Sequence, residues 1–183
     1  MTGVLTYLWV GVLLMWATFG LLNFVTDSQM AFLAAIFIAG GVIAGLHQTI
    51  VIRGLIAVLE PVGVVLPLMA MWHVAGRLGV SVPVFSTVEV SVFAVAYVAF
   101  LAASVGVIPV EVYRLGYAPI PVAVMVLALC AYGAVTGNVM VPLVAVAGQA
   151  LWVMGWGSSN WFDHVLHAML VPVVIVVLVM RVI

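Results

Sequence analysis

Charged side chains are scarce in this chain. Asp, Glu, Lys and Arg together make up 5% of its 183 residues, whereas hydrophobic residues make up 68%. A soluble domain carries about a quarter charged residues, so this composition cannot cover a surface that faces water. A lipid bilayer is the solvent that fits, and lipid is the first partner we expect. The net charge of −1 gives no indication of nucleic acid as a partner.

Lysine is absent altogether, and cysteine almost so. Without lysine, the chain has no P-loop lysine for phosphate and no Schiff base to retinal or pyridoxal. A seven-helix retinal pigment is therefore excluded. Cys130 is the single cysteine, so no disulfide forms within the chain, and its apolar surroundings predict a small core residue. The four cations are Arg53, Arg77, Arg114 and Arg181.

Long apolar runs, separated by short polar or Gly/Pro breaks, fill the rest of the sequence. Runs of about 20 residues are long enough to cross a bilayer as helices. Strands of a membrane barrel alternate polar and apolar residues, which these runs do not. The sequence therefore predicts an all-α integral membrane protein with one transmembrane domain over residues 1–183. Its seven expected helices cover about 4–25, 30–52, 55–75, 85–108, 118–135, 139–156 and 161–180.

The topology has two open alternatives at this point. If the run over 55–75 is re-entrant or lies at the interface, the chain crosses six times, and the C-terminus changes sides. Orientation is undecided too, because Arg53 and Arg114 fall on one face while Arg77 and Arg181 fall on the other. The N-terminus lacks the basic start of a cleaved signal peptide, so we expect the first run to remain as a helix. The first three and last three runs share no evident residue repeat.

Ionisable residues gather where several runs begin or end. Because consecutive helices alternate in direction, the junctions of the second with the third and the sixth with the seventh run share one membrane face. Asp163 and His167 have helical i,i+4 spacing, and His164 and His167 have i,i+3 spacing. The ionisable residues expected on that face are His47, Arg53, Glu60, Asp163, His164 and His167.

Imidazole and carboxylate side chains are the groups that zinc binds in catalytic sites, where a metal-bound water becomes a nucleophile. We therefore predict that His47, His164 and His167 are metal ligands. Glu60 and Asp163 are the predicted catalytic carboxylates. The alternative is that these groups are interfacial residues, with Glu60 paired to Arg53.

This pattern resembles the seven-helix membrane hydrolase superfamily of the alkaline ceramidases and the progestin/adiponectin receptors. His47 ends the second run, Glu60 opens the third, and Asp163-His164-Val165-Leu166-His167 opens the seventh. The resemblance implies a zinc ion held by these groups and the cleavage of a lipid amide or ester. Ile43 stands where the family has Ser, and Glu60 stands where it has Asp.

Two other classes of function fit the same sequence. One is a small-solute or ion transporter or channel, in which the polar face is a gate or a binding site. The other is a subunit of a membrane complex that binds haem or quinone, since two His on different helices are able to ligate haem. Either class suits a homo-oligomer or a larger assembly.

Overall fold

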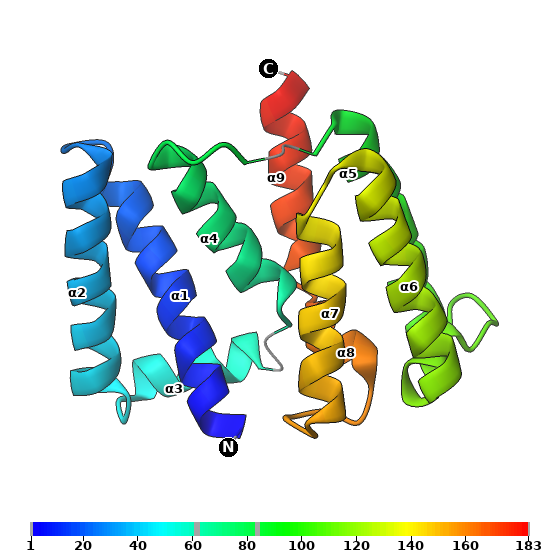
Figure 1. Ribbon diagram of the computed structural model, residues 1–183. Helices are drawn as coiled ribbons and strands as arrows, with labels where there is room; N and C mark the ends of the chain where they lie inside the picture. Colours follow the sequence, from blue (N-terminus) through cyan, green and yellow to red (C-terminus); the bar gives the residue numbers. More distant parts are fainter. Residues whose placement is uncertain (1, 61–62, 83–84, 183) are drawn as a thin grey trace. The chain divides into compact units, whose positions relative to one another are not determined.

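The computed structural model describes residues 2–60, 63–82 and 85–182, and every regular element in these ranges is helical. The chain forms two compact units, an N-terminal unit over Met1–Val82 and a C-terminal unit over Pro83–Ile183 (Figure 1). The expected all-α fold is confirmed.

The N-terminal unit is built on a pair of long helices, α1 (Thr2–Leu22) and α2 (Ser28–Leu46), which lie side by side (Figure 1). Asp27 caps α2 by accepting hydrogen bonds from the backbone N–H groups of Gln29 and Met30, at 3.1 and 3.0 Å. One face of α2 carries small residues four apart, which let α1 approach closely. These buried residues are Ala31, Ala35 and Ala39.

Two shorter helices complete this unit. Helix α3 (Ile50–Leu59) runs across the ends of α1 and α2, and α4 (Val65–Arg77) packs against α1 (Figure 1). Phe19 of α1 and Val74 of α4 are buried with Ala31 and Ala35 in one apolar cluster. The N-terminal unit therefore has its core between α1, α2 and α4.

The C-terminal unit has six helical elements. They are α5 (Thr87–Ser104), the 3₁₀ helix η1 (Val112–Tyr117), α6 (Pro119–Thr136), α7 (Met140–Val153), α8 (Trp161–Val165) and α9 (Leu170–Val182). Helix α7 packs against both α6 and α8, and α9 packs against α5. Ser86 and Glu89 form a capping box at the start of α5.

Glycine sets two close approaches in this unit. A Cβ on Gly133 of α6 would lie 2.3 Å from the ring of Pro142 in α7, and one on Gly148 of α7 would lie 2.4 Å from Val165 of α8. Both distances are far below van der Waals contact. Gly133 and Gly148 thus let α7 sit directly against its two neighbours.

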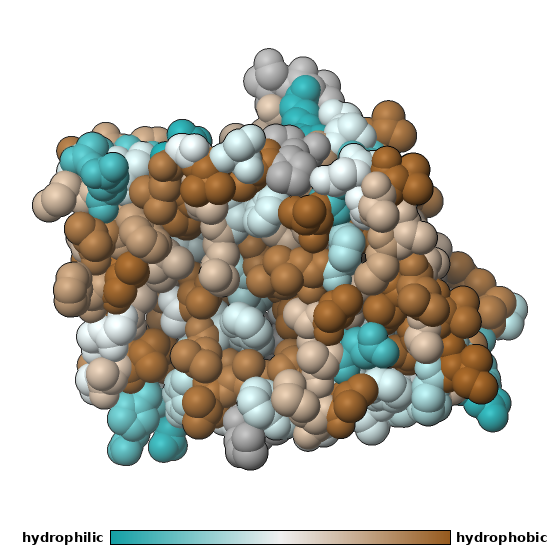
Figure 2. Space-filling view, in the orientation of Figure 1, coloured by the Kyte–Doolittle hydropathy of each residue, from teal (hydrophilic) through white to brown (hydrophobic). Residues whose placement is uncertain are grey.

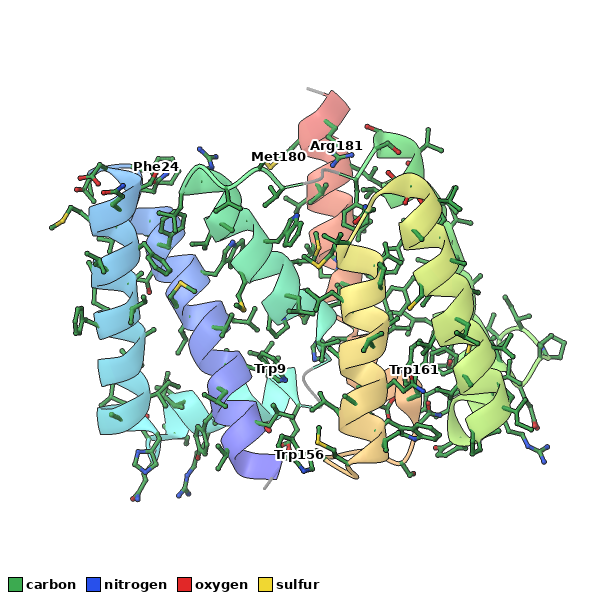
Figure 3. All side chains as sticks on the ribbon, viewed as in Figure 1. Trp9, Phe24, Trp156, Trp161, Met180 and Arg181 are labelled. Atoms are coloured by element: carbon green, nitrogen blue, oxygen red, sulfur yellow. The ribbon has the colours of Figure 1, made fainter. Side chains whose placement is uncertain are left out.

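Apolar side chains cover much of the face shown in Figure 2. Phe37 on α2, Val95 on α5 and Leu127 on α6 are more than half exposed. So are Phe24 and Met180, which Figure 3 labels. Among the described residues, four helices are long and apolar enough to cross a membrane: Gly3–Leu22, Ser28–Leu46, Thr87–Ser104 and Pro119–Thr136. Three further apolar helices are shorter, at Ile50–Leu59, Met140–Val153 and Leu170–Arg181.

Two of the seven expected helices are each broken into two helices. The expected helix over 55–75 is interrupted between α3 and α4, and the one over 161–180 is interrupted between α8 and α9. The prediction that each is one continuous helix is wrong. The expected second helix also ends early, at Leu46, and residues up to 52 belong partly to α3.

Proline explains both interruptions. A proline inside a helix has no N–H to donate, and its ring clashes with the carbonyl group four residues earlier. Pro67 and Pro172 are each the third residue of a 13-residue helix, α4 and α9. In a continuous helix they would clash with Gly63 and Ala168, so each helix starts anew just before its proline. Glu60 also precedes Pro61, and its extended backbone is the conformation that a residue before proline prefers.

Candidate functional site

The five residues predicted to form a metal site belong to both units. His47 and Glu60 lie in the N-terminal unit, and the other three lie in the C-terminal unit. His47 follows the last residue of α2, where its Nδ1 lies 3.1 Å from the carbonyl oxygen of Ala44 and its ring meets Tyr7 edge-on. Glu60 is exposed and ends α3. Arg53 is exposed as well, and in the part of the chain that the structure describes no ion pair joins it to Glu60.

Asp163 is the centre of a polar cluster in the C-terminal unit. The Tyr113 hydroxyl donates to both of its carboxylate oxygens, at 2.7 and 2.8 Å, and the Ser158 hydroxyl donates to Oδ2 at 2.5 Å. Burial raises the pKa of the Tyr113 phenol, and the hydrogen bond to Asp163 raises it further. Tyr113 therefore remains a neutral hydrogen-bond donor to this carboxylate.

Asn160 joins the cluster to η1. Its side chain is fully buried, accepts a hydrogen bond from the N–H of Phe162 at 2.9 Å, and donates one to the carbonyl oxygen of Tyr113 at 2.8 Å. Asn160 is the N-cap of α8. A Cβ on Gly116 of η1 would lie 2.0 Å from the Asn160 Oδ1 atom. Only glycine leaves room for Asn160 at this place.

The two predicted histidine ligands of this unit are almost fully buried, at 5% exposure for His164 and 8% for His167. The Nε2 atom of His164 lies 2.8 Å from the carbonyl oxygen of Ser158. The Nδ1 atom of His167 accepts a hydrogen bond from the N–H of Met169 at 3.1 Å, so this nitrogen carries no proton. Each ring thus has one nitrogen engaged by the backbone.

The interruption of the expected seventh helix changes how these residues are related. Helix α8 ends at Val165, with a last helical hydrogen bond from the N–H of Leu166 to Phe162. Residues 166–169 are not helical, so Asp163 and His167 do not share one helix face through i,i+4 spacing. The backbone N–H of Met169, close to the start of α9, donates its hydrogen bond to the His167 ring and not to a carbonyl oxygen of the preceding helical turn.

A metal centre of the predicted kind needs three protein ligands around one point. Within residues 2–60, 63–82 and 85–182, no three His, Cys, Asp or Glu side chains lie close enough together to hold one ion. The cluster instead joins Asp163 to two hydroxyl groups, those of Tyr113 and Ser158. The zinc site with His47, His164 and His167 stays a prediction.

Tyr113 is a member of the polar cluster that sequence reasoning missed. It lies 50 residues from Asp163 along the chain and in a segment read only as a loop. No spacing rule links two such positions. Ser158 had a weaker signal, since it stands in the polar break Gly157–Asn160 just before α8.

Outside this cluster, polar side chains also join neighbouring helices within each unit. The Trp16 Nε1 group of α1 lies 3.4 Å from the Nδ1 atom of His73 in α4. In the C-terminal unit the Tyr132 hydroxyl of α6 donates to Glu89 of α5 at 2.5 Å. Each contact gives a polar side chain a hydrogen-bond partner in an apolar unit, which is a structural role.

Compared with protein-family models, with curated proteins and with solved structures, the chain matches none of them. The features that bear on its function are therefore the polar cluster around Asp163 and the two interrupted segments.

Proposed function

We propose that this protein is a multi-pass membrane transporter that moves a small polar solute or ion through the bilayer. One observation carries the proposal: an apolar segment long enough to cross the membrane is interrupted at residues 166–169, beside buried polar groups. In lipid, a break in a helix is tolerated where it is enclosed by protein or lines a polar cavity. Transporters use such discontinuous helices to bind their substrates.

The N-terminal unit contains a second interruption of the same kind. In each unit the last apolar segment is split into a short helix, a break of a few residues, and a 13-residue helix with proline at its third position. Short interrupted segments at matching places in two halves are the best sequence pointer to a transport site. A 13-residue helix extends about 20 Å, which is less than the bilayer core of about 30 Å. We propose that the interrupted segments α3–α4 and α8–α9 each cross the membrane once. Together with α7 and the four long helices, they give seven crossings.

The side chains at the second break suit a polar substrate or a proton. His167 lies in the break, and Asp163 and His164 lie in the short helix before it. Buried ionisable groups within a membrane segment are costly, and they commonly mark substrate paths and proton relays. We assign the segment Asp163–His167 to the transport path.

The test is a current measurement on reconstituted protein. Proteoliposomes are adsorbed on a solid-supported membrane, and rapid concentration jumps of Na⁺, K⁺, H⁺, amino acids and sugars are applied. We expect a saturable transient current for at least one solute, reduced at least tenfold in His167→Ala. The matched control is His73→Ala in α4, which leaves the current in place. Folded protein that gives no more current than empty liposomes for the whole panel contradicts the proposal.

A metal-dependent lipid hydrolase, as in the ceramidase and receptor superfamily, is the second candidate. The burial of His164 and His167 is the observation that favours it, since buried imidazoles are common zinc ligands. Metal analysis of protein purified without added metal tests it: about one zinc per chain, lost in His164→Ala and His167→Ala, moves the assignment to the hydrolase. A haem band in the visible spectrum of the same sample indicates a cofactor-binding subunit instead.

A further inference from the structure

Oxygen atoms converge at Asp163 from three parts of the C-terminal unit. The Tyr113 hydroxyl comes from η1 and contacts both carboxylate oxygens, while the Ser158 hydroxyl comes from the loop between α7 and α8. The three side chains are all partly buried, so solvent still reaches them. The two hydroxyl oxygens thus each lie within hydrogen-bond distance of the Asp163 carboxylate.

Among the residues that the structure describes, no cationic side chain forms an ion pair with this carboxylate. Arg114 of η1 pairs with Glu111 instead, at 3.4 Å, and both side chains are exposed. Arg114 is the neighbour of Tyr113 in sequence, yet it is engaged with Glu111 and not with Asp163. A partly buried carboxylate without a counter-charge is costly, even when hydroxyl groups donate to it.

We propose that Asp163, Ser158 and Tyr113 bind a monovalent alkali cation of the sodium class. Carboxylate and hydroxyl oxygens are hard ligands, which alkali and alkaline-earth ions prefer to nitrogen or sulfur. One carboxylate matches one positive charge, whereas calcium sites in proteins use several. A hydroxyl oxygen has two lone pairs and a hydrogen that rotates. The Ser158 oxygen uses one lone pair to accept a hydrogen bond from the N–H of Asn160 at 3.0 Å, which leaves the other for the cation once its hydrogen turns away from it. The Tyr113 hydroxyl is able to turn in the same way.

The position of this site in the chain gives the cation a role. Asp163 lies in α8, three residues before the break that begins after Val165. Ions that drive transport are commonly bound at discontinuous helices. The cation is then the coupling ion of the transporter, and this role rests on the proposed function, although binding of the ion does not.

Ion binding is measured on the full chain in mild detergent, without any flux. NaCl, LiCl or KCl replaces choline chloride at constant ionic strength, and the midpoint of thermal unfolding is followed by tryptophan fluorescence. A ligand at about 100 times its Kd raises the midpoint by roughly 5 °C in a protein of this size. We expect a saturable rise of that order with at least one alkali ion, and no rise in Asp163→Asn.

Two further variants keep the test decisive if Asp163→Asn does not fold. Tyr113→Phe and Ser158→Ala each remove one hydroxyl oxygen, and each is expected to weaken ion binding about tenfold. Glu111→Gln is the matched control, because it removes an exposed carboxylate from η1 and is expected to leave the ion response unchanged.

The site is overturned if no alkali ion stabilises the protein more than choline, if calcium alone does so, or if the three site variants respond like the parent. Other outcomes separate the failure of the transport proposal from the failure of the ion site. Sodium binding in detergent with no current in proteoliposomes contradicts transport and retains the site. A current that does not depend on alkali ions, together with no binding, contradicts the site and retains transport.

Discussion

At the scale of single residues, the polar cluster depends on side chains that fit closely around Asn160 and Asp163. Asn160 is enclosed by η1, and two hydroxyl groups donate to Asp163, that of Tyr113 shared between both carboxylate oxygens. Such groups stabilise the fold only while all partners are in place, because a buried polar atom that loses its partner pays for its lost hydration. Substitutions here should therefore act on stability as well as on function.

Gly116→Ala is expected to destabilise the protein by about 1–3 kcal/mol, because the new Cβ has no room beside Asn160 and Phe162. The measurement is the unfolding midpoint of the purified protein in detergent. Gly54→Ala in α3 is the control, since a Cβ there meets nothing within 4 Å and a helix gains about 1 kcal/mol from the exchange. Equal midpoints for the two variants would show that η1 does not pack on Asn160.

Tyr113 makes stability depend on pH in the alkaline range. Its pKa is raised above the ordinary tyrosine value of about 10, so the folded state retains the phenolic proton more strongly than the unfolded state. This contribution is complete below about pH 10 and is lost as the pH rises from there towards the folded-state pKa. Thermal midpoints between pH 8 and 11 should fall less steeply in Tyr113→Phe than in the parent. Parallel curves for both proteins would contradict this account.

At the scale of elements, prolines and caps decide where the helices start. Asp27, Ser86 and Asn160 each cap a helix with a side-chain oxygen. Pro67 and Pro172 instead force a helix to start late, since neither tolerates a continuous helix through the preceding turn. The apolar runs over 55–75 and 161–180 predict uninterrupted helices, although each run contains one of these prolines.

Pro172→Ala is expected to let α8 and α9 join, because the new residue has an N–H for the carbonyl of Ala168 and no ring to clash with it. Amide hydrogen exchange of Leu166–Met169, followed by mass spectrometry, should become slower by at least tenfold. The current of the reconstituted protein should fall with it. Pro119→Ala, at the first residue of α6, is the control and should change neither. Unchanged exchange in Pro172→Ala would mean that other contacts maintain the break.

The cap of α2 offers a simpler test of an element boundary. Asp27→Ala removes the acceptor for two N–H groups and should cost about 1 kcal/mol, whereas Asp27→Asn should cost less because it retains an oxygen. The thermal midpoint of each variant measures the difference. A thermal midpoint of Asp27→Ala equal to that of the parent would show that water replaces the cap without loss of stability.

At the scale of the whole molecule, the number of crossings is the open variable. Four of the described helices are long enough by themselves, and the seven-crossing topology requires α7 and the two interrupted segments to cross as well. If α3 and α4 together cross once, Gln48 and Val80 lie on opposite sides of the membrane. If they return to the same face, both residues lie on one side, and the total falls to six.

Single-cysteine labelling decides between these topologies. In a Cys130→Ala background, cysteines at Gln48 and Val80 are treated with a membrane-impermeant maleimide in sealed, oriented vesicles. We expect only one of the two to react before the vesicles are opened. Equal labelling of both in sealed vesicles contradicts the seven-crossing topology.

The helical fold could be predicted from the sequence because composition alone decides it. Apolar runs without charges must satisfy their own backbone in lipid, and the α-helix does this locally. The candidate site was less accessible. The predicted pairing of Asp163 and His164 with His167 depends on one continuous helix, and α8 ends at Val165, before His167. Helical spacing relates two side chains only where the helix between them is unbroken.

The amino-acid sequence by itself determined that the chain suits a lipid environment, that its elements are helices, and roughly where most of them begin and end. Each of these depends on composition or on residues a few positions apart. Only the tertiary structure decided that Tyr113 meets Asp163 across 50 residues, that Gly116 makes room for Asn160, and that α8 lies against α7 at Gly148. Such contacts depend on how the loops bring distant segments together. The polar cluster exists because η1 and the start of α8 pack against each other, and no local pattern encodes that packing.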